Sequence, residues 1–172
     1  PENALKSKKL GGDSDQIGGG LCRYSTDYRW LVPHFEKMLY DNSLFTTALI
    51  EAYQVTGKKE FANYANDLLH YIDRDMTSDE GAFFSAEDAD SEGVEGKFYV
   101  WSKEEIENIL GRKTASLAIP FYNITQKGNF EGKNILHLTR GPETVAKEIG
   151  MNPYDFNKEL QVAREKLLEV RS

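Results

Sequence analysis

The sequence predicts a mainly α-helical protein built of antiparallel helical hairpins, with a β-hairpin inserted between helices. Apolar residues recur at helical spacing over residues 35–53 and again over residues 61–76, with only the short segment TGKKE between them. The period changes to alternation in GAFFSAEDAD, which leads through the Gly-containing connection SEGVEG into KFYVWS. Two helices joined by so short a loop pack antiparallel, and the alternating arms indicate a pair of strands.

The first helix of this hairpin is expected to begin at Pro33, because proline is favoured at the first helical position. Glu36 would then lie in the first turn, where a negative charge suits the helix dipole. The helix is expected to end near Gly57, and its partner is expected to run to Met76.

The C-terminal half predicts further helices. The capping-box pattern S-x-x-E that starts at Ser102 predicts a short helix ending at Gly111. Pro120 is expected to interrupt any helix that follows. Another helix is expected near residues 142–149, and a last one from Asn152 to the end of the chain.

Residues 1–20 are expected to form a flexible N-terminal segment. They contain five glycines, three of them consecutive at 18–20, and glycine disfavours both helix and strand. The folded domain is therefore expected to comprise residues 21–172. Because the chain starts at Pro1 rather than Met, we expect it to be part of something longer.

Composition excludes several classes of partner. The net charge of −7 argues against nucleic acid and against an anionic membrane surface, which both require clustered Lys and Arg. No apolar run approaches the roughly 20 residues of a membrane span. The single cysteine, Cys22, allows no internal disulfide and no C-x-x-C redox pair, and no signal peptide is visible. We expect a cytoplasmic protein without a cofactor.

Four segments carry a resemblance to a known family. DQIGGG, RYSTDYRWLVPHFEKMLYDN, FFSAEDADSEGVEGKFYVW and GNFEGKNIL resemble the spermatogenesis-associated protein 20 family over most of residues 10–140. That resemblance implies a thioredoxin-like domain followed by an (α/α)6 toroid related to six-hairpin glycosidases and N-acylglucosamine 2-epimerases. It implies that residues 21–172 are an incomplete toroid and that the thioredoxin-like domain is missing. Leu21 and Cys22 depart from the family pattern, which has Phe and often His there.

The resemblance also suggests a function. A complete toroid of this kind is expected to bind or process a carbohydrate, as a hydrolase or an epimerase, although this chain alone is expected to be inactive. The alternative is a non-catalytic module that presents a ligand or client to the thioredoxin-like domain.

The segment RYSTDYRWLVPHFEKMLYDN contains most of the candidate site residues. His34, at the expected helix N-terminus, is expected to stay neutral and to accept a proton, with Glu36 beside it. Aromatic rings could stack on a sugar while charged groups bond its hydroxyls. The candidate ligand-binding residues are Arg23, Tyr24, Trp30, Asp41 and Asn42. The same residues also fit a polar network that holds the Gly-rich loop on the helix ends.

Asn42 is expected to be buried, because it falls inside the apolar arc of its helix. A buried amide without partners costs about 1–3 kcal/mol. We therefore predict at least two hydrogen bonds to its side chain from outside that helix.

The acidic run SAEDADSEG supplies the other two candidate catalytic residues, Asp88 and Asp90. One carboxylate could serve as acid and the other as base or nucleophile, since neighbouring like charges raise one pKa. DADSEG also matches the first half of an EF-hand loop, but Tyr99 replaces the Glu expected at the twelfth position. Looser cation binding stays an alternative, and we predict no metal-ligating residues. Alternatively, the Asp side chains cap turn amides.

The incomplete toroid predicts uncovered apolar faces. The expected open flanks are the stripe of residues 35–53 and a row on the last helix, comprising Phe156, Leu160, Ala163 and Leu167. Because large apolar patches are uncommon on monomers, we expect self-association.

Overall fold

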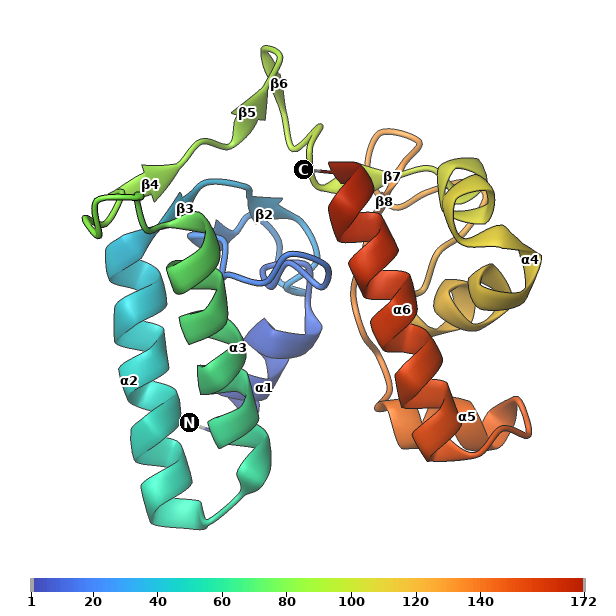
Figure 1. The fold of residues 1–172 in the computed structure, drawn as a ribbon, viewed down its shortest axis with the longest axis horizontal. Coiled ribbons are helices and arrows are strands. Elements are labelled where there is room, and N and C mark those ends of the chain that lie inside the picture. The colour runs from blue at the N-terminus through green and yellow to red at the C-terminus, as the bar shows by residue number, and fades with distance from the viewer. Residues whose placement is uncertain (1, 172) are drawn as a thin grey trace. The chain divides into compact units, whose positions relative to one another are not determined.

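The computed structural model describes residues 2–171 and confirms a mainly α-helical fold. Six helices and several two-stranded antiparallel pairs lie within these residues (Figure 1). The chain divides into two compact units, one ending at Lys97 and the other beginning at Phe98. No helix within residues 2–171 is both long and apolar enough to cross a membrane.

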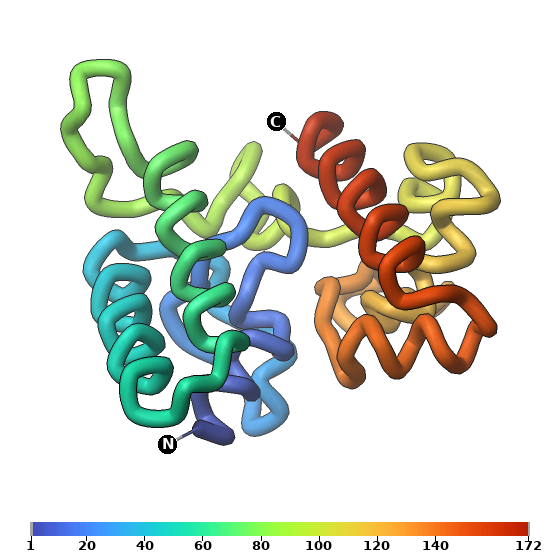
Figure 2. Tube along the Cα trace, turned by 60° about the horizontal axis from the view of Figure 1, so that its bottom comes forward, coloured from blue at the N-terminus to red at the C-terminus, as the bar shows by residue number. Residues whose placement is uncertain are grey.

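The N-terminal unit is organised around the predicted helical hairpin. Helix α2 (Leu39–Thr56) packs against α3 (Lys59–Asp75), with two residues between them (Figures 1 and 2). The hairpin encloses a core formed by Leu21, Leu49, Phe61, Tyr64, Ala65 and Leu68.

The start of α2 differs from the sequence prediction. The helix begins at Leu39, six residues later than Pro33. Strand β2 (Pro33–His34) pairs with β1 (Tyr24–Ser25), and the next paired segment, β3 (Lys37–Met38), directly precedes α2. Because these residues are extended and paired, the prediction that His34 lies at a helix N-terminus is wrong.

A helix also forms within the segment expected to be flexible. Helix α1 spans Glu2–Leu10, which contains neither Gly nor Pro, with Glu2 in the first turn and Lys8 and Lys9 in the last. It ends at Gly11, where an added Cβ would overlap the carbonyl oxygen of Trp30. The glycines at 18–20 are buried rather than solvated.

The predicted β-hairpin forms only at its tip. Strand β5 (Asp90–Ser91) pairs with β6 (Val94–Glu95) across Glu92 and Gly93, which both have positive φ. Two positive-φ residues make the tight turn that suits a two-residue hairpin. The preceding arm pairs elsewhere, because β4 (Ala86–Glu87) lies beside β3.

The C-terminal unit contains the other three helices. Helix α6 (Pro153–Arg171) packs on α4 (Lys103–Phe121) and on α5 (Pro142–Glu148). Strand β7 (Val100–Trp101) pairs with β8 (Asn134–Ile135). Helix α4 continues past Gly111, where the backbone is non-helical, and has Pro120 in its last turn.

The row on α6 that was expected to be an open flank is covered. Phe156, Ala163 and Leu167 are fully buried, and Leu160 is 8% exposed. The Phe156 ring meets the Phe121 ring edge-on at 5.7 Å, so α4 covers this face. The stripe of residues 35–53 is covered only in part, since Phe35 and Leu49 are buried whereas Tyr53 is 40% exposed. The row on α6 is therefore covered within its own unit, and the stripe of residues 35–53 is covered in part.

Candidate functional site

The β1–β2 pair assembles the candidate site. It places Tyr24 opposite His34, and their rings stack with centroids 5.1 Å apart. The backbone N–H of Arg23 donates to the carbonyl of Glu36 at 2.9 Å, which extends the pairing by one residue. Segments 23–25 and 33–36 are thus fixed side by side without a helix.

His34 lies between two carboxylates. Its Nδ1 is 2.8 Å from Oε1 of Glu95, and its Nε2 is 3.8 Å from Oε2 of Glu36. The same Glu36 oxygen is 3.1 Å from the Arg23 guanidinium. The result is a partly exposed chain of polar side chains, Glu95–His34–Glu36–Arg23. We name these four residues the His34 cluster.

Three predicted ligand-binding residues line one pocket next to this cluster. The pocket has a volume of about 370 Å³ and is lined by Lys8, Arg23, Tyr24, Ser25, Asp27, Tyr28 and Trp30. We call it the aromatic pocket. Arg23 and Tyr24 belong to its wall and also contact Glu36 and His34, so the pocket and the His34 cluster are continuous.

A capped turn shapes the wall that carries Tyr28 and Trp30. Asp27 accepts hydrogen bonds from the backbone N–H groups of Arg29 at 2.6 Å, Leu31 at 3.2 Å and Val32 at 2.6 Å. Burial raises the pKa of Asp27, but these N–H groups outweigh it and hold the pKa below the usual range. Trp30 has φ 61°, a left-handed conformation uncommon for a large residue, and its carbonyl accepts from Gly12 at 2.8 Å.

A buried network behind the site joins chain segments, as the other interpretation expects, but through Lys37 rather than through the candidate residues. Lys37, only 1% exposed, donates to Asp15 and to the carbonyl of Gly19, both at 2.9 Å. The Tyr71 hydroxyl donates to Glu87 at 2.6 Å, and Glu87 lies 3.8 Å from Lys37. This network ties the Gly-rich loop and β4 to the helical hairpin, so the segment both lines a pocket and holds chain segments together.

The prediction for Asn42 is confirmed. Its side chain makes two hydrogen bonds to the backbone of Leu21, which lies outside α2, and a third to the carbonyl of Met38. Asn42 is fully buried and does not line the aromatic pocket, so its interactions here are structural.

Asp41 lies near the charges of the site without lining the aromatic pocket. Burial raises its pKa, while the charges of Arg23 and Lys8 oppose the shift. One carboxylate oxygen, Oδ2, is buried and has no hydrogen-bond partner within the described residues.

The β-hairpin that follows the acidic run contacts His34 through Glu95, which was not among the predicted site residues. Asp88 accepts the backbone N–H of Asp90 at 3.0 Å, which is the turn-capping geometry considered above. Asp90 pairs with Glu95 across the β5–β6 hairpin, and it is Glu95 that contacts His34. A catalytic role for Asp88 and Asp90 stays a prediction. Among residues 2–171, no group of three or more His, Cys, Asp or Glu is placed to hold a metal.

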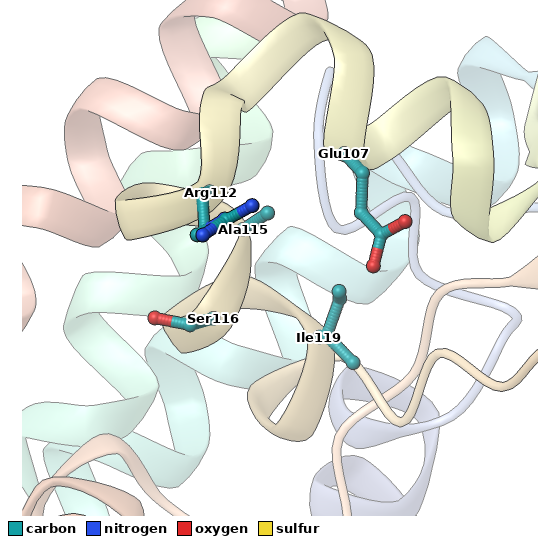
Figure 3. Close-up of a pocket in the computed structure, with 5 residues that line it drawn as sticks. All are labelled: Glu107, Arg112, Ala115, Ser116 and Ile119. Atoms are coloured by element: carbon teal, nitrogen blue, oxygen red, sulfur yellow. The ribbon is translucent and has the colours of Figure 1, made fainter.

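A second hollow lies on α4 and was not anticipated. It has a volume of about 410 Å³ and is lined by Glu107, Arg112, Ala115, Ser116 and Ile119 (Figure 3). All five residues belong to α4, on either side of the break at Gly111.

These features define a class of protein: a mainly α-helical chain with an aromatic pocket beside a histidine flanked by carboxylates. No protein-family model matches the chain. It is 32% identical to spermatogenesis-associated protein 20 of Homo sapiens over 98% of this chain, and 31% identical to that of Mus musculus over the same share. It is also 32% identical to the uncharacterized protein B0495.5 of Caenorhabditis elegans over 99% of the chain.

The chain is therefore homologous to spermatogenesis-associated protein 20 over nearly its whole length, which confirms the resemblance of its motifs. It spans about a quarter of the length of these curated relatives.

Proposed function

We propose that the aromatic pocket and the His34 cluster form a carbohydrate site, and that His34 transfers a proton to and from the bound sugar in the whole protein. One observation carries the proposal: His34 is held between Glu95 and Glu36 at the edge of a pocket walled by Tyr24, Tyr28 and Trp30.

The pairing with Glu95 favours a particular role for the imidazole. When Nδ1 carries the proton and donates it to Glu95, Nε2 has a free lone pair and can act as a base. Glu36, next to Nε2, then stabilises the imidazolium that forms when His34 takes a proton. Arg23 holds Glu36 in place.

The proton transfer is epimerase-like. Nε2 of His34 removes a proton from a sugar carbon next to a carbonyl, and the electron pair of that C–H bond passes into the resulting enolate. The enolate then turns in the pocket and the proton returns from His34 to the opposite face of the same carbon, which inverts that centre. This base chemistry needs one oriented imidazole, whereas glycoside hydrolysis needs two carboxyl groups roughly 5–9.5 Å apart on either side of the scissile bond.

The aromatic pocket supplies the means of holding the sugar. Aromatic rings pack against the apolar face of a sugar ring, and the polar groups around them fix its orientation. A cytoplasmic setting is part of this proposal, supported by the single free cysteine, Cys22.

Two measurements test the proposal. Saturation-transfer NMR on this chain is expected to detect binding of monosaccharides, which is weakened in Tyr24→Ala and Trp30→Ala. In the whole protein incubated with a sugar in D2O, loss of the proton signal at the carbon beside the carbonyl is expected to report exchange. His34→Gln abolishes that exchange, Glu95→Gln slows it, and His70→Gln, an exposed histidine on α3, serves as the matched control.

The outcomes separate the two functions considered from the sequence. An absence of sugar binding to this chain overturns the carbohydrate proposal. If the chain then binds unfolded peptides instead, the client-binding alternative is supported. Sugar binding without exchange in the whole protein would remove only the catalytic role of His34.

A further inference from the structure

The aromatic pocket contains two cations, and each already has a carboxylate partner. Nζ of Lys8 is 3.1 Å from Oδ2 of Asp13, whose side chain is fully buried, and the Arg23 guanidinium is 3.1 Å from Glu36. Lys8 also lies over the Trp30 ring, 5.4 Å from its centroid. The positive charges that line the pocket are thus neutralised from within the protein.

Three backbone donors of the turn beside the pocket are also occupied. A protein site for phosphate or carboxylate generally presents unpaired backbone N–H groups or free Arg and Lys side chains. Here the three N–H groups of the turn at Arg29, Leu31 and Val32 already bind the Asp27 carboxylate. An incoming anion would meet Asp27 itself and would have to displace Glu36 or Asp13. The net charge of the chain, −7, adds repulsion.

The pocket instead offers neutral groups. Tyr24 and Tyr28 are 50% and 89% exposed, and neither phenol hydroxyl has a hydrogen-bond partner among residues 2–171. The backbone of the third aromatic residue, Trp30, is held by a hydrogen bond that its carbonyl accepts from the N–H of Gly12. A phenol hydroxyl both donates and accepts, which suits a hydroxyl-rich ligand better than a charged one.

We propose that the aromatic pocket selects an uncharged sugar over its phosphorylated or carboxylated counterpart. This inference rests on the proposed function and adds the charge of the ligand to it. The paired cations explain the selectivity, because a neutral ring can stack on the aromatic side chains without breaking either ion pair.

Fluorine NMR on the chain labelled with 5-fluorotryptophan tests the inference. The sequence has two tryptophans: Trp30 lies in the pocket, whereas Trp101 is buried in the C-terminal unit and serves as an internal reference. Trp30→Phe assigns the two signals. Glucose, mannose and N-acetylglucosamine are titrated beside glucose 6-phosphate and glucuronate at matched ionic strength. We expect neutral sugars to shift the Trp30 signal saturably and the anions to bind at least roughly 5-fold more weakly, equivalent to about 1 kcal/mol.

A charge variant provides the complementary test. Glu36→Gln frees the Arg23 guanidinium and is expected to tighten binding of glucose 6-phosphate by roughly 2- to 5-fold, the range of an exposed ion pair. Glu51→Gln, an exposed residue on α2 outside the pocket, changes the net charge equally and is expected to leave that binding unchanged.

The outcomes distinguish this inference from the proposed function. If glucose 6-phosphate or glucuronate binds as tightly as glucose, the charge selectivity is wrong while the carbohydrate site stands. If Glu36→Gln and Glu51→Gln have equal effects, the ion pair is not its source and the inference is overturned. If no sugar shifts the Trp30 signal, the carbohydrate site itself is wrong.

Discussion

The side-chain amide of Asn42 is bonded to both backbone groups of Leu21. Its Oδ1 accepts the N–H of Leu21 at 2.7 Å, and its Nδ2 donates to the carbonyl of Leu21 at 3.0 Å. The pairing satisfies a fully buried amide and fixes the end of the Gly-rich loop against α2. Cys22 and Arg23 follow directly, so the same contact helps to place the aromatic pocket.

Replacing Asn42 by leucine is therefore expected to destabilise the N-terminal unit. Asn42→Leu leaves the N–H and carbonyl of Leu21 buried and unpaired, and we expect a loss of about 1–3 kcal/mol in the free energy of unfolding, measured by urea denaturation. Asn66→Leu, an exposed position on α3, is the control and should change stability by no more than about 0.5 kcal/mol. Equal stability of the two variants would contradict the role assigned to the Leu21 contact.

Cys22 gives a prediction about alkaline stability. Burial raises the pKa of its thiol from 9.0 to about 12, although the nearby charge of Lys37 opposes this. Because the folded pKa is raised, the unfolded chain loses this proton first. The contribution of the Cys22 thiol to the free energy of unfolding is fully present below about pH 9. It falls by about 1.4 kcal/mol per pH unit until about pH 12.

Urea denaturation between pH 8 and pH 11 measures this dependence. Cys22→Ala is expected to have a shallower decline of stability with pH than the parent, whatever its stability at pH 8. The decline should not vanish, because burial also raises the pKa of Tyr64 and Tyr71. Parallel pH profiles for parent and variant would show that Cys22 does not contribute.

Helices could be predicted from this sequence because burial repeats along them with a simple period. The stripe Phe61, Tyr64, Ala65, Leu68 and Ile72 appears in the sequence and is buried in α3. Asn42 was predictable for the same reason, since a polar residue inside an apolar arc requires partners.

The candidate site was only partly predictable, because it depends on pairings between distant segments. Nothing local marks Glu95 as the partner of His34, 61 positions earlier, since β6 brings it there through a tight turn. The strand pairing of Lys37 with Glu87 likewise keeps residues 37–38 extended, so that α2 begins at Leu39 and not at Pro33. Tertiary contacts here outweigh the preference of proline for the first helical position. Arg23, Tyr24 and Trp30 were predictable from residue type and from their proximity in the sequence.

Self-association is expected through the solvent-facing side of α2. Tyr40, Leu44 and Val55 share one arc of α2, opposite its core face, and are 46%, 68% and 86% exposed. A second copy packing on this face is expected to produce a dimer at high concentration in light scattering. Leu44→Glu should shift the equilibrium to monomer, whereas Val170→Glu, an exposed position on α6, should not. A parent chain that stays monomeric at every concentration would contradict this expectation.

Gly93 and Gly96 form a matched pair for testing how the β5–β6 hairpin supports His34. Both have positive φ, 76° and 74°, so alanine at either position incurs a similar backbone cost, of roughly 1–2 kcal/mol. They differ in surroundings: a Cβ at Gly93 meets nothing within 4 Å, whereas a Cβ at Gly96 would overlap the ring of buried Phe35. Gly96→Ala is therefore expected to destabilise the chain by about 1–3 kcal/mol more than Gly93→Ala.

The same overlap should also separate the His34–Glu95 pair, because Phe35 follows His34 and Gly96 follows Glu95. The ring signals of His34 in nitrogen-15 NMR should therefore change in Gly96→Ala but not in Gly93→Ala. Equal stability losses with unchanged His34 signals would show that the Gly96–Phe35 contact does not position Glu95.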